Sequence, residues 1–221
     1  MSLRLVIDTS LNACSLGLFD GETCLFQIIE GMMRGQQERL PVMALEGFQA
    51  TGIRAKDLDL IGVTLGPGSF TGVRVGLSFA KGLATGADVA LKGIGTLEAL
   101  GHHAELRSKS RMAVVNGGRG QIYVQTFDGG SAVTLDTNAP EVISEYAAAH
   151  PVDILTGPAT ALLQAYWPAT QEFPQTWPAL DALSRLTVDM GHDNLTPLYM
   201  READAIASTR GIISLNETVS S

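Results

Sequence analysis

The chain has 221 residues, of which 45% are apolar and 17% charged, a composition typical of a globular protein with enough apolar surface for two small lobes. Its formal charge of −8, without a cluster of lysine and arginine, argues against direct binding of nucleic acid, because phosphate contacts supply most of that affinity. Since no apolar segment is long enough to cross a membrane, no secretory pattern is present and the two cysteines indicate reduced interior thiols, we expect a cytoplasmic protein.

The first thirty residues predict a three-stranded meander. Apolar runs at 3–7, 14–19 and 23–29 have the length of strands, and Asp20-Gly21 between the last two is typical of a hairpin turn. In the actin and sugar-kinase architecture, the turn after the first such strand carries an aspartate and small residues that face a nucleotide phosphate.

Asp8, Thr9 and Ser10 stand at that turn in this sequence. Leu11 and Asn12, however, replace the glycine and hydroxyl residues that would surround a phosphate. We therefore favour a structural turn capped by Asp8, and phosphate binding is the alternative.

A strand at 60–65, a glycine-proline loop at 66–69 and a helix reaching residue 84 are predicted in the centre of the first half. Glycine and proline at this density require turn dihedrals, and Ser69 or Thr71 can cap the first turn of the helix. Apolar residues recur at helical spacing at Val73, Leu77, Ala80 and Ala84. Because amides at the start of a helix attract anions, the candidate phosphate-facing residues are Asp8, Thr9, Ser10, Gly66, Gly68 and Ser69.

Small residues also recur at every fourth position of this helix, at Gly72, Gly76, Ala80 and Ala84. Each glycine inside a helix costs about 1 kcal/mol relative to alanine, so two of them require a reason, such as the close approach of another element. That element is either a second protein or the chain's own sheet, and the spacing does not choose between them.

The second half of the chain repeats the order of the first in shorter form. The first half is completed by a helix at 36–50, a strand at 89–94 and a helix at 96–104. The second half has strands at 112–115, 121–127, 132–135 and 152–156, helices at 140–149, 159–166 and 180–190, a loop at 168–178 and an extended segment at 196–201. We therefore predict an α/β fold with a first lobe at 1–104, a smaller second lobe at 105–201, and a tail at 202–221 with the option of returning to the first lobe.

The sequence lacks the usual patterns of a catalytic site. Ser69 has neither the flanking glycines of a nucleophile elbow nor an evident histidine base. His102 and His103 point in different directions on a helix, and no HxxxH pair occurs, so no metal site is expected. The loop at 66–72 has no lysine where a P-loop requires one, because Arg74 stands one turn into the helix. We expect no catalytic residue and no metal ligand.

Four segments carry a more specific signal. They read DTSLNACSLGLF at 8–19, LGPGSFTGVRVGLSFAKGLA at 65–84, GIGTLEAL at 93–100 and TPLYMRE at 196–202. Together and in this order they resemble the bacterial TsaB (YeaZ) family of the TsaD/Gcp-like, peptidase M22-like superfamily. The resemblance implies an actin-like (ASKHA, ribonuclease H-like) fold of two lobes, each a mixed sheet with helices.

The resemblance also implies a function. A TsaB-like protein is a non-catalytic scaffold subunit that binds a TsaD-type transferase, together with a TsaE-type ATPase, for the synthesis of N6-threonylcarbamoyladenosine in tRNA. The tRNA is then reached only through the complex, the isolated chain carries no cofactor, and ATP or ADP is expected only at the interface of the complex. A homodimer through the same face is the alternative state of the isolated chain.

The partner-binding face implied by the family lies on two helices. It comprises Gln36, Leu40, Met43, Phe48, Gly72, Val73, Gly76, Leu77 and Ala80. Because the family implies a partner-binding face here, we expect the groove at Gly72 and Gly76 to be the seam, that is, the interface, between two proteins. A Gly76→Leu substitution should then abolish the complex and leave the fold intact.

Three departures from the family pattern and two rival functions stay open. One departure is Gln121, which stands where the family has an acidic residue, and Arg119 is offset by one position from the arginine of the family. The family often has histidine where Gln36 stands, and Asp-Ala-Arg where this chain reads Asn116-Gly117-Gly118, so we transfer no ligand role to that hairpin. One rival is an ATP-using enzyme of the actin and sugar-kinase type, with Asp8 and the loop at 66–68 around the phosphates. The other is an M22-type metallopeptidase, which would need zinc or iron.

Overall fold

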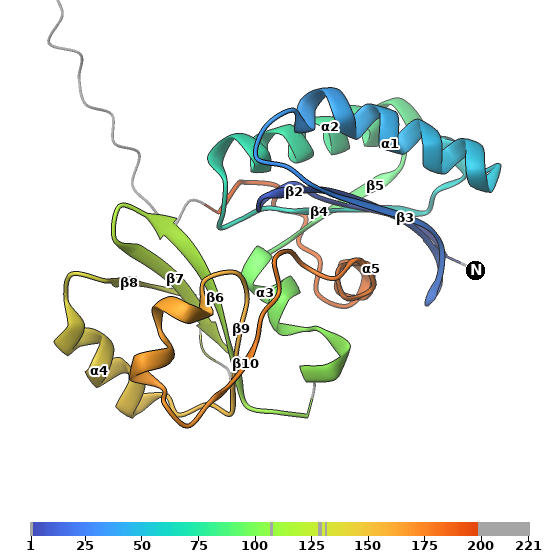
Figure 1. Cartoon of the computed structure of the whole chain (residues 1–221). Coiled ribbons are helices and arrows are strands. Elements are labelled where there is room, and N and C mark those ends of the chain that lie inside the picture. Colours follow the sequence, from blue (N-terminus) through green and yellow to red (C-terminus); the bar gives the residue numbers. More distant parts are fainter. Residues whose placement is uncertain (1, 107, 128–129, 131, 199–221) are drawn as a thin grey trace, which may run out of the picture.

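The computed structural model describes residues 2–198 except 107, 128, 129 and 131, and it contains two five-stranded sheets (Figure 1). The first sheet has β1 (Leu3–Asp8), β2 (Ala13–Asp20), β3 (Thr23–Gly31), β4 (Leu60–Thr64) and β5 (Ala90–Ile94). The second has β6 (Arg111–Gly118), β7 (Gln121–Thr126), β8 (Val133–Asp136), β9 (Ile154–Thr156) and β10 (Gln171–Phe173). The helices are α1 (Gln36–Thr51), α2 (Phe70–Ala87), α3 (Thr96–Gly101), α4 (Pro140–Ala149) and α5 (Leu180–Asp189), with short 3-10 turns at Ala55–Asp57, Ala104–Leu106, Thr160–Leu162 and Gln164–Tyr166.

The two sheets have the same topology. The strand orders are β3-β2-β1-β4-β5 and, read from the other edge, β8-β7-β6-β9-β10. In each sheet the first strand is central, antiparallel to the second strand and parallel to the fourth. The predicted α/β arrangement of two lobes with a mixed sheet in each is therefore confirmed, and the second sheet is a shortened copy of the first.

The central strand β1 is buried on both faces, which explains its unbroken apolar sequence. Leu5 and Ile7 pack in one cluster with Leu40 of α1 and Leu77 of α2. Val6, which points to the opposite face as strand alternation requires, packs in a second cluster with the leucines of α5. Three layers thus result in the first lobe, with α1 and α2 on one face of the sheet and α5 on the other (Figure 1).

The two lobes exchange the helices that follow their last strands. Helix α3 follows β5 of the first sheet, but Leu97 and Leu100 of this helix pack against Val115 and Tyr123 of the second. Helix α5 follows β10 of the second sheet, but its leucines pack against Val6 and the other residues of the first. Separation of the lobes would therefore expose two apolar clusters.

The exchange corrects the predicted boundaries. The expected second lobe at 105–201 is too long, because residues 180–198 lie on the first lobe. His192 pairs with Gly93, and the amide of Leu198 donates to the carbonyl oxygen of Leu65 at 2.7 Å. The tail predicted at 202–221 and the end of the extended segment at 199–201 lie outside the described residues.

Two elements of the second lobe differ from their prediction. Strand β10 lies inside the predicted loop at 168–178, where three residues between prolines are too short to show a period. The predicted helix at 159–166 consists of two 3-10 turns, held by Leu163 and Trp167, which are buried in the core of this lobe.

The two cysteines differ in exposure. Cys14 is buried, and burial raises the pKa of its thiol to about 12. Cys24 is exposed, so the expectation of two interior thiols is wrong for this residue, because β3 is an edge strand of the first sheet.

The small-residue face of α2 packs against the chain itself. A Cβ atom at Gly72 would lie 2.0 Å from the carbonyl oxygen of Thr9, and one at Gly76 would lie 2.4 Å from Thr9 Oγ1. The structure thus decides for packing on the chain's own sheet, and the expected seam between two proteins at Gly72 and Gly76 is wrong. The expectation that Gly76→Leu would leave the fold intact fails with it.

We predict that two Gly→Ala substitutions in α2 have opposite effects on stability. Gly72→Ala should lower the free energy of unfolding by about 2 kcal/mol or more, because its Cβ meets backbone that cannot move away. Gly82→Ala should raise it by about 0.5–1 kcal/mol, because no atom lies within 4 Å and alanine favours the helix. Urea denaturation of both variants measures the difference, and equal effects would contradict the packing of α2 described here.

Candidate functional site

Helices α1 and α2 lie side by side on one face of the first sheet, and the residues implied as partner-binding form their inner surface (Figure 1). Eight of these residues are buried in the chain, namely Gln36, Leu40, Met43, Gly72, Val73, Gly76, Leu77 and Ala80. Phe48 is half-buried. Gln36 donates from Nε2 to the carbonyl oxygen of Met32 at 3.2 Å. Most of this set therefore fixes how the two helices sit on the sheet, and other residues form their accessible surface.

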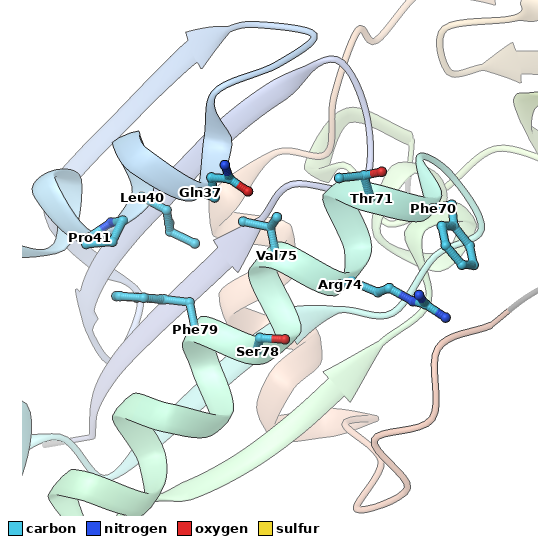
Figure 2. A pocket seen from close by; sticks show the side chains of 9 residues that line it. All are labelled: Gln37, Leu40, Pro41, Phe70, Thr71, Arg74, Val75, Ser78 and Phe79. Carbon is cyan, nitrogen blue, oxygen red and sulfur yellow. The ribbon is translucent and has the colours of Figure 1, made fainter. Parts of the chain in front are cut away.

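A groove of about 500 Å³ runs between the outer faces of α1 and α2 (Figure 2). Its lining residues are Gln37, Leu40, Pro41, Phe70, Thr71, Arg74, Val75, Ser78 and Phe79. Leu40 and Pro41 of α1 face Val75 and Phe79 of α2 across an apolar floor (Figure 2). At the other end the guanidinium of Arg74 lies over the ring of Phe70, 3.8 Å from its centroid, in a cation–π contact.

Several large apolar side chains on and before these helices are exposed, and one of them, Phe70, lines the groove. Met33 before α1, Val42 and Leu45 on α1, and Phe70 on α2 have exposed fractions of 79%, 46%, 55% and 55%. An exposed aromatic ring at the edge of an apolar groove favours an interaction surface, whereas single exposed apolar residues elsewhere are normal.

The sequence did contain a signal for the groove on α2. Thr71, Arg74, Val75 and Ser78 recur at helical spacing, one position away from the buried stripe. They are the outward face of the same helix, and an exposed Phe70 precedes them.

The turn after β1 is closed by Asp8, as predicted. Asp8 Oδ1 accepts hydrogen bonds from Ser10 N at 3.0 Å, Ser10 Oγ at 2.5 Å and Thr64 Oγ1 at 2.7 Å. Burial raises the pKa of the Asp8 carboxyl, and the bonds from Ser10 and Thr64 oppose this shift. Asp8, Thr9 and Ser10 are at most 1% exposed, so they form an internal turn.

The glycine-proline loop closes directly on this turn. Ser69 N donates to the carbonyl oxygen of Ser10 at 2.6 Å, and a Cβ at Gly68 would lie 2.1 Å from the same oxygen. Ser69 also caps α2, because its Oγ accepts from Gly72 N at 3.1 Å. Two amides that could donate to a phosphate here, Ser10 N and Ser69 N, thus already donate to Asp8 Oδ1 and to the carbonyl oxygen of Ser10.

A second hollow, of about 500 Å³, lies between the lobes. Ser10, Leu11, Asn12, Gly68 and Ser69 line it from the first lobe, and Val115, Asn116, Gly117, Gly118, Pro158 and Thr176 line it from the second. Of the six candidate phosphate-facing residues, Ser10, Gly68 and Ser69 reach this hollow. The side chain of Asn116 is used locally, since its Oδ1 accepts from Gly118 N at 2.7 Å.

The described part of the chain holds neither a cluster of metal ligands nor a membrane-spanning helix. There, no group of three or more His, Cys, Asp and Glu side chains could hold a metal ion. Over the same residues, no helix is long and apolar enough to span a bilayer.

We predict opposite pH dependences for two aspartates. Because burial raises the pKa of Asp8, the wild-type protein should lose stability relative to Asp8→Asn as pH rises above about 4, by up to about 1.4 kcal/mol per pH unit. Arg54 lowers the pKa of Asp57 to about 2, so the advantage of wild type over Asp57→Asn should be present above pH 4 and be lost as pH falls toward 2. Urea denaturation from pH 2 to 7 measures both differences, and a flat Asp8→Asn difference would contradict the burial of a titrating carboxyl.

Comparisons with known proteins agree with this fold. The family model of TsaD, tRNA N6-adenosine threonylcarbamoyltransferase, matches residues 30–188. The tRNA threonylcarbamoyladenosine biosynthesis protein TsaB of Escherichia coli K12 is 31% identical over 121 residues, covering 54% of this chain and 52% of the relative. TsaB of Haemophilus influenzae is 36% identical over 122 residues, covering 54% and 51%. A tRNA N6-adenosine threonylcarbamoyltransferase of Cereibacter sphaeroides is 30% identical over 210 residues, covering 87% and 55%.

The chain thus spans about half the length of the curated relatives that it matches. A solved structure of a Pseudomonas aeruginosa protein with similarity to peptidase YEAZ superposes with a TM-score of 0.74 at 22% identity, covering 91% of this chain and all of that one. With the duplicated sheet topology, this likeness confirms the predicted actin-like fold class. The chain therefore belongs to the TsaB (YeaZ) family of TsaD-like proteins, the family that its four sequence segments resemble.

Proposed function

We propose that this chain is a non-catalytic binding subunit in the cytoplasmic synthesis of N6-threonylcarbamoyladenosine in tRNA. It docks on a TsaD-type transferase through the outer faces of α1 and α2 and works with a TsaE-type ATPase. The observation that carries the proposal is the groove between these helices, with its apolar floor and the exposed Phe70 at its edge, in a chain whose relatives include both TsaB proteins and a threonylcarbamoyltransferase.

The groove has the make-up of a protein interface. Its floor is apolar, and exposed Phe70 and Arg74 belong to residue types that are enriched at protein interfaces. Because α1 and α2 are fixed by their buried inner faces, the groove is formed before a partner binds, which reduces the entropic cost of docking. A second copy of this chain is the rival occupant in the absence of a transferase.

The tRNA is proposed to be reached only through the complex. The chain has 15 lysines and arginines against 23 acidic residues, and a net charge of −8 repels a polyanion. A basic partner must then supply the phosphate contacts.

We predict that Ser78→Arg weakens binding to the cognate TsaD-type transferase at least tenfold. Ser78 is exposed and lines the groove, so the longer side chain fills it and adds a second cation beside Arg74, while the core is left untouched. Isothermal titration calorimetry of the two purified proteins measures the affinity, and size-exclusion chromatography reports the complex and any homodimer.

Val188→Arg provides the matched control. Val188 is 55% exposed on α5, on the opposite face of the first sheet, and the same substitution there should leave affinity within twofold. If the transferase binds the Ser78→Arg variant as tightly as the wild-type chain, docking through the groove is refuted. Failure of the wild-type chain to bind any TsaD-type transferase would refute the proposed function itself.

We further propose that the isolated chain carries no cofactor and that ATP or ADP binds only at the interface of the complex. In support, Asp8 is internal to its turn, and Ser69 N is bonded to Ser10. Calorimetric titration of the isolated chain with ATP and magnesium, up to about 1 mM ATP, should give no saturable heat. Saturable micromolar binding would instead support the rival, an ATP-using enzyme of the sugar-kinase type.

A further inference from the structure

A small pocket lies on the face of the first sheet opposite to α1 and α2. It has a volume of about 270 Å³ and is bounded by β1, the turn between β2 and β3, and α5. The residues that give it its chemistry are Arg4, Gly21, Glu22, Asp181, Ser184 and Arg185. At roughly 30 Å³ per water molecule, it has room for a small ion and its water.

Arg4 is a buried cation without a counter-charge among the residues that the structure describes. The residue is 6% exposed, and its guanidinium donates from Nη1 to the carbonyl oxygen of Ser184 at 3.2 Å and from Nη2 to that of Gly21. Both acceptors are neutral, Nε has no partner, and none of the carboxylates that the structure describes forms an ion pair with this arginine. Burial of an unpaired charge is costly, so an anion nearby would be stabilising.

A second unpartnered donor lines the same pocket. Ser184 is 2% exposed, and its Oγ has no hydrogen-bond partner among the described residues. A guanidinium and a hydroxyl both donate to oxyanions, and such charge-assisted bonds are the stronger ones.

The remaining charges around the pocket largely cancel. Arg185 Nη1 lies 3.6 Å from Asp181 Oδ2, and Arg185 Nη2 donates to the carbonyl oxygen of His102 at 3.1 Å. Glu22 is exposed at the rim, where water screens its charge. The uncompensated buried charge is therefore the positive one of Arg4.

We propose that this pocket binds a small oxyanion, a phosphate or a carboxylate, beside Arg4 and Ser184. The site is separate from the groove between α1 and α2, and the proposal does not depend on the proposed function. Phosphate and carboxylate share the acceptor chemistry, and the experiment below distinguishes them.

The test is an NMR titration of the full-length ¹⁵N-labelled chain with sodium phosphate and, separately, with sodium acetate at constant ionic strength. The amides of Gly21 and Ser184 and the Nε–H signal of Arg4 should shift saturably, with a Kd on the order of 1 mM for the preferred anion. Glu22→Gln, an exposed substitution that removes the rim charge, should tighten binding about two- to fivefold. Ser184→Ala should weaken it by a similar factor.

Arg54→Gln is the control, because Arg54 is an exposed arginine paired with Asp57 outside this pocket, and its loss should leave the titration unchanged. Saturation with phosphate only, or with acetate only, identifies the class of anion and supports the site. Shifts that stay linear with concentration, or that are spread over all arginine signals, would overturn it. Unchanged affinity in Glu22→Gln and Ser184→Ala would overturn it as well.

Discussion

The close approach of α2 to the turn after β1 is the constraint on which the candidate site depends. Thr9 Oγ1 donates to the carbonyl oxygen of Gly72 at 2.7 Å, and there is no room for a Cβ at residues 68, 72 or 76. This contact fixes the rotation of α2 about its axis. As a result, the face with Arg74, Val75 and Ser78 points away from the sheet and forms the groove with α1 (Figure 2).

The exchange of α3 and α5 restricts the motions open to the two lobes. Helix α5 sits so close to the first sheet that a Cβ at Gly62 would lie 2.1 Å from Thr187 Oγ1. Opening the lobes would pull Leu97 and Leu183 out of apolar clusters, at about 1.5–3 kcal/mol for each fully buried leucine. An enzyme that closes on its substrate needs a hinge whose opening costs less free energy than the exposure of these leucines. A subunit that presents a fixed surface does not, which agrees with the role proposed here.

The sequence predicted the strands and helices of the first lobe well because each has a clear period and a clear stop. It could not predict which element fills the space beside Gly72, because the contact is with Thr9, 63 residues earlier in the chain. Spacing left two explanations open, and the family resemblance favoured the wrong one. The amphipathic pattern of α5 likewise predicted a helix, but no local signal tells which of two sheets its leucines cover.

The inner faces of α1 and α2 are therefore constrained by packing on the sheet, whereas their outer faces are not. A change on the inner face, as at Gly72 or Met43, would alter how the helix sits on its own sheet and so would affect the groove only through the fold. A change on the outer face, as at Ser78, would alter the proposed docking groove and leave the core unchanged. Binding specificity in such a chain can thus vary without loss of stability. This separation lets related proteins with the same fold bind different partners.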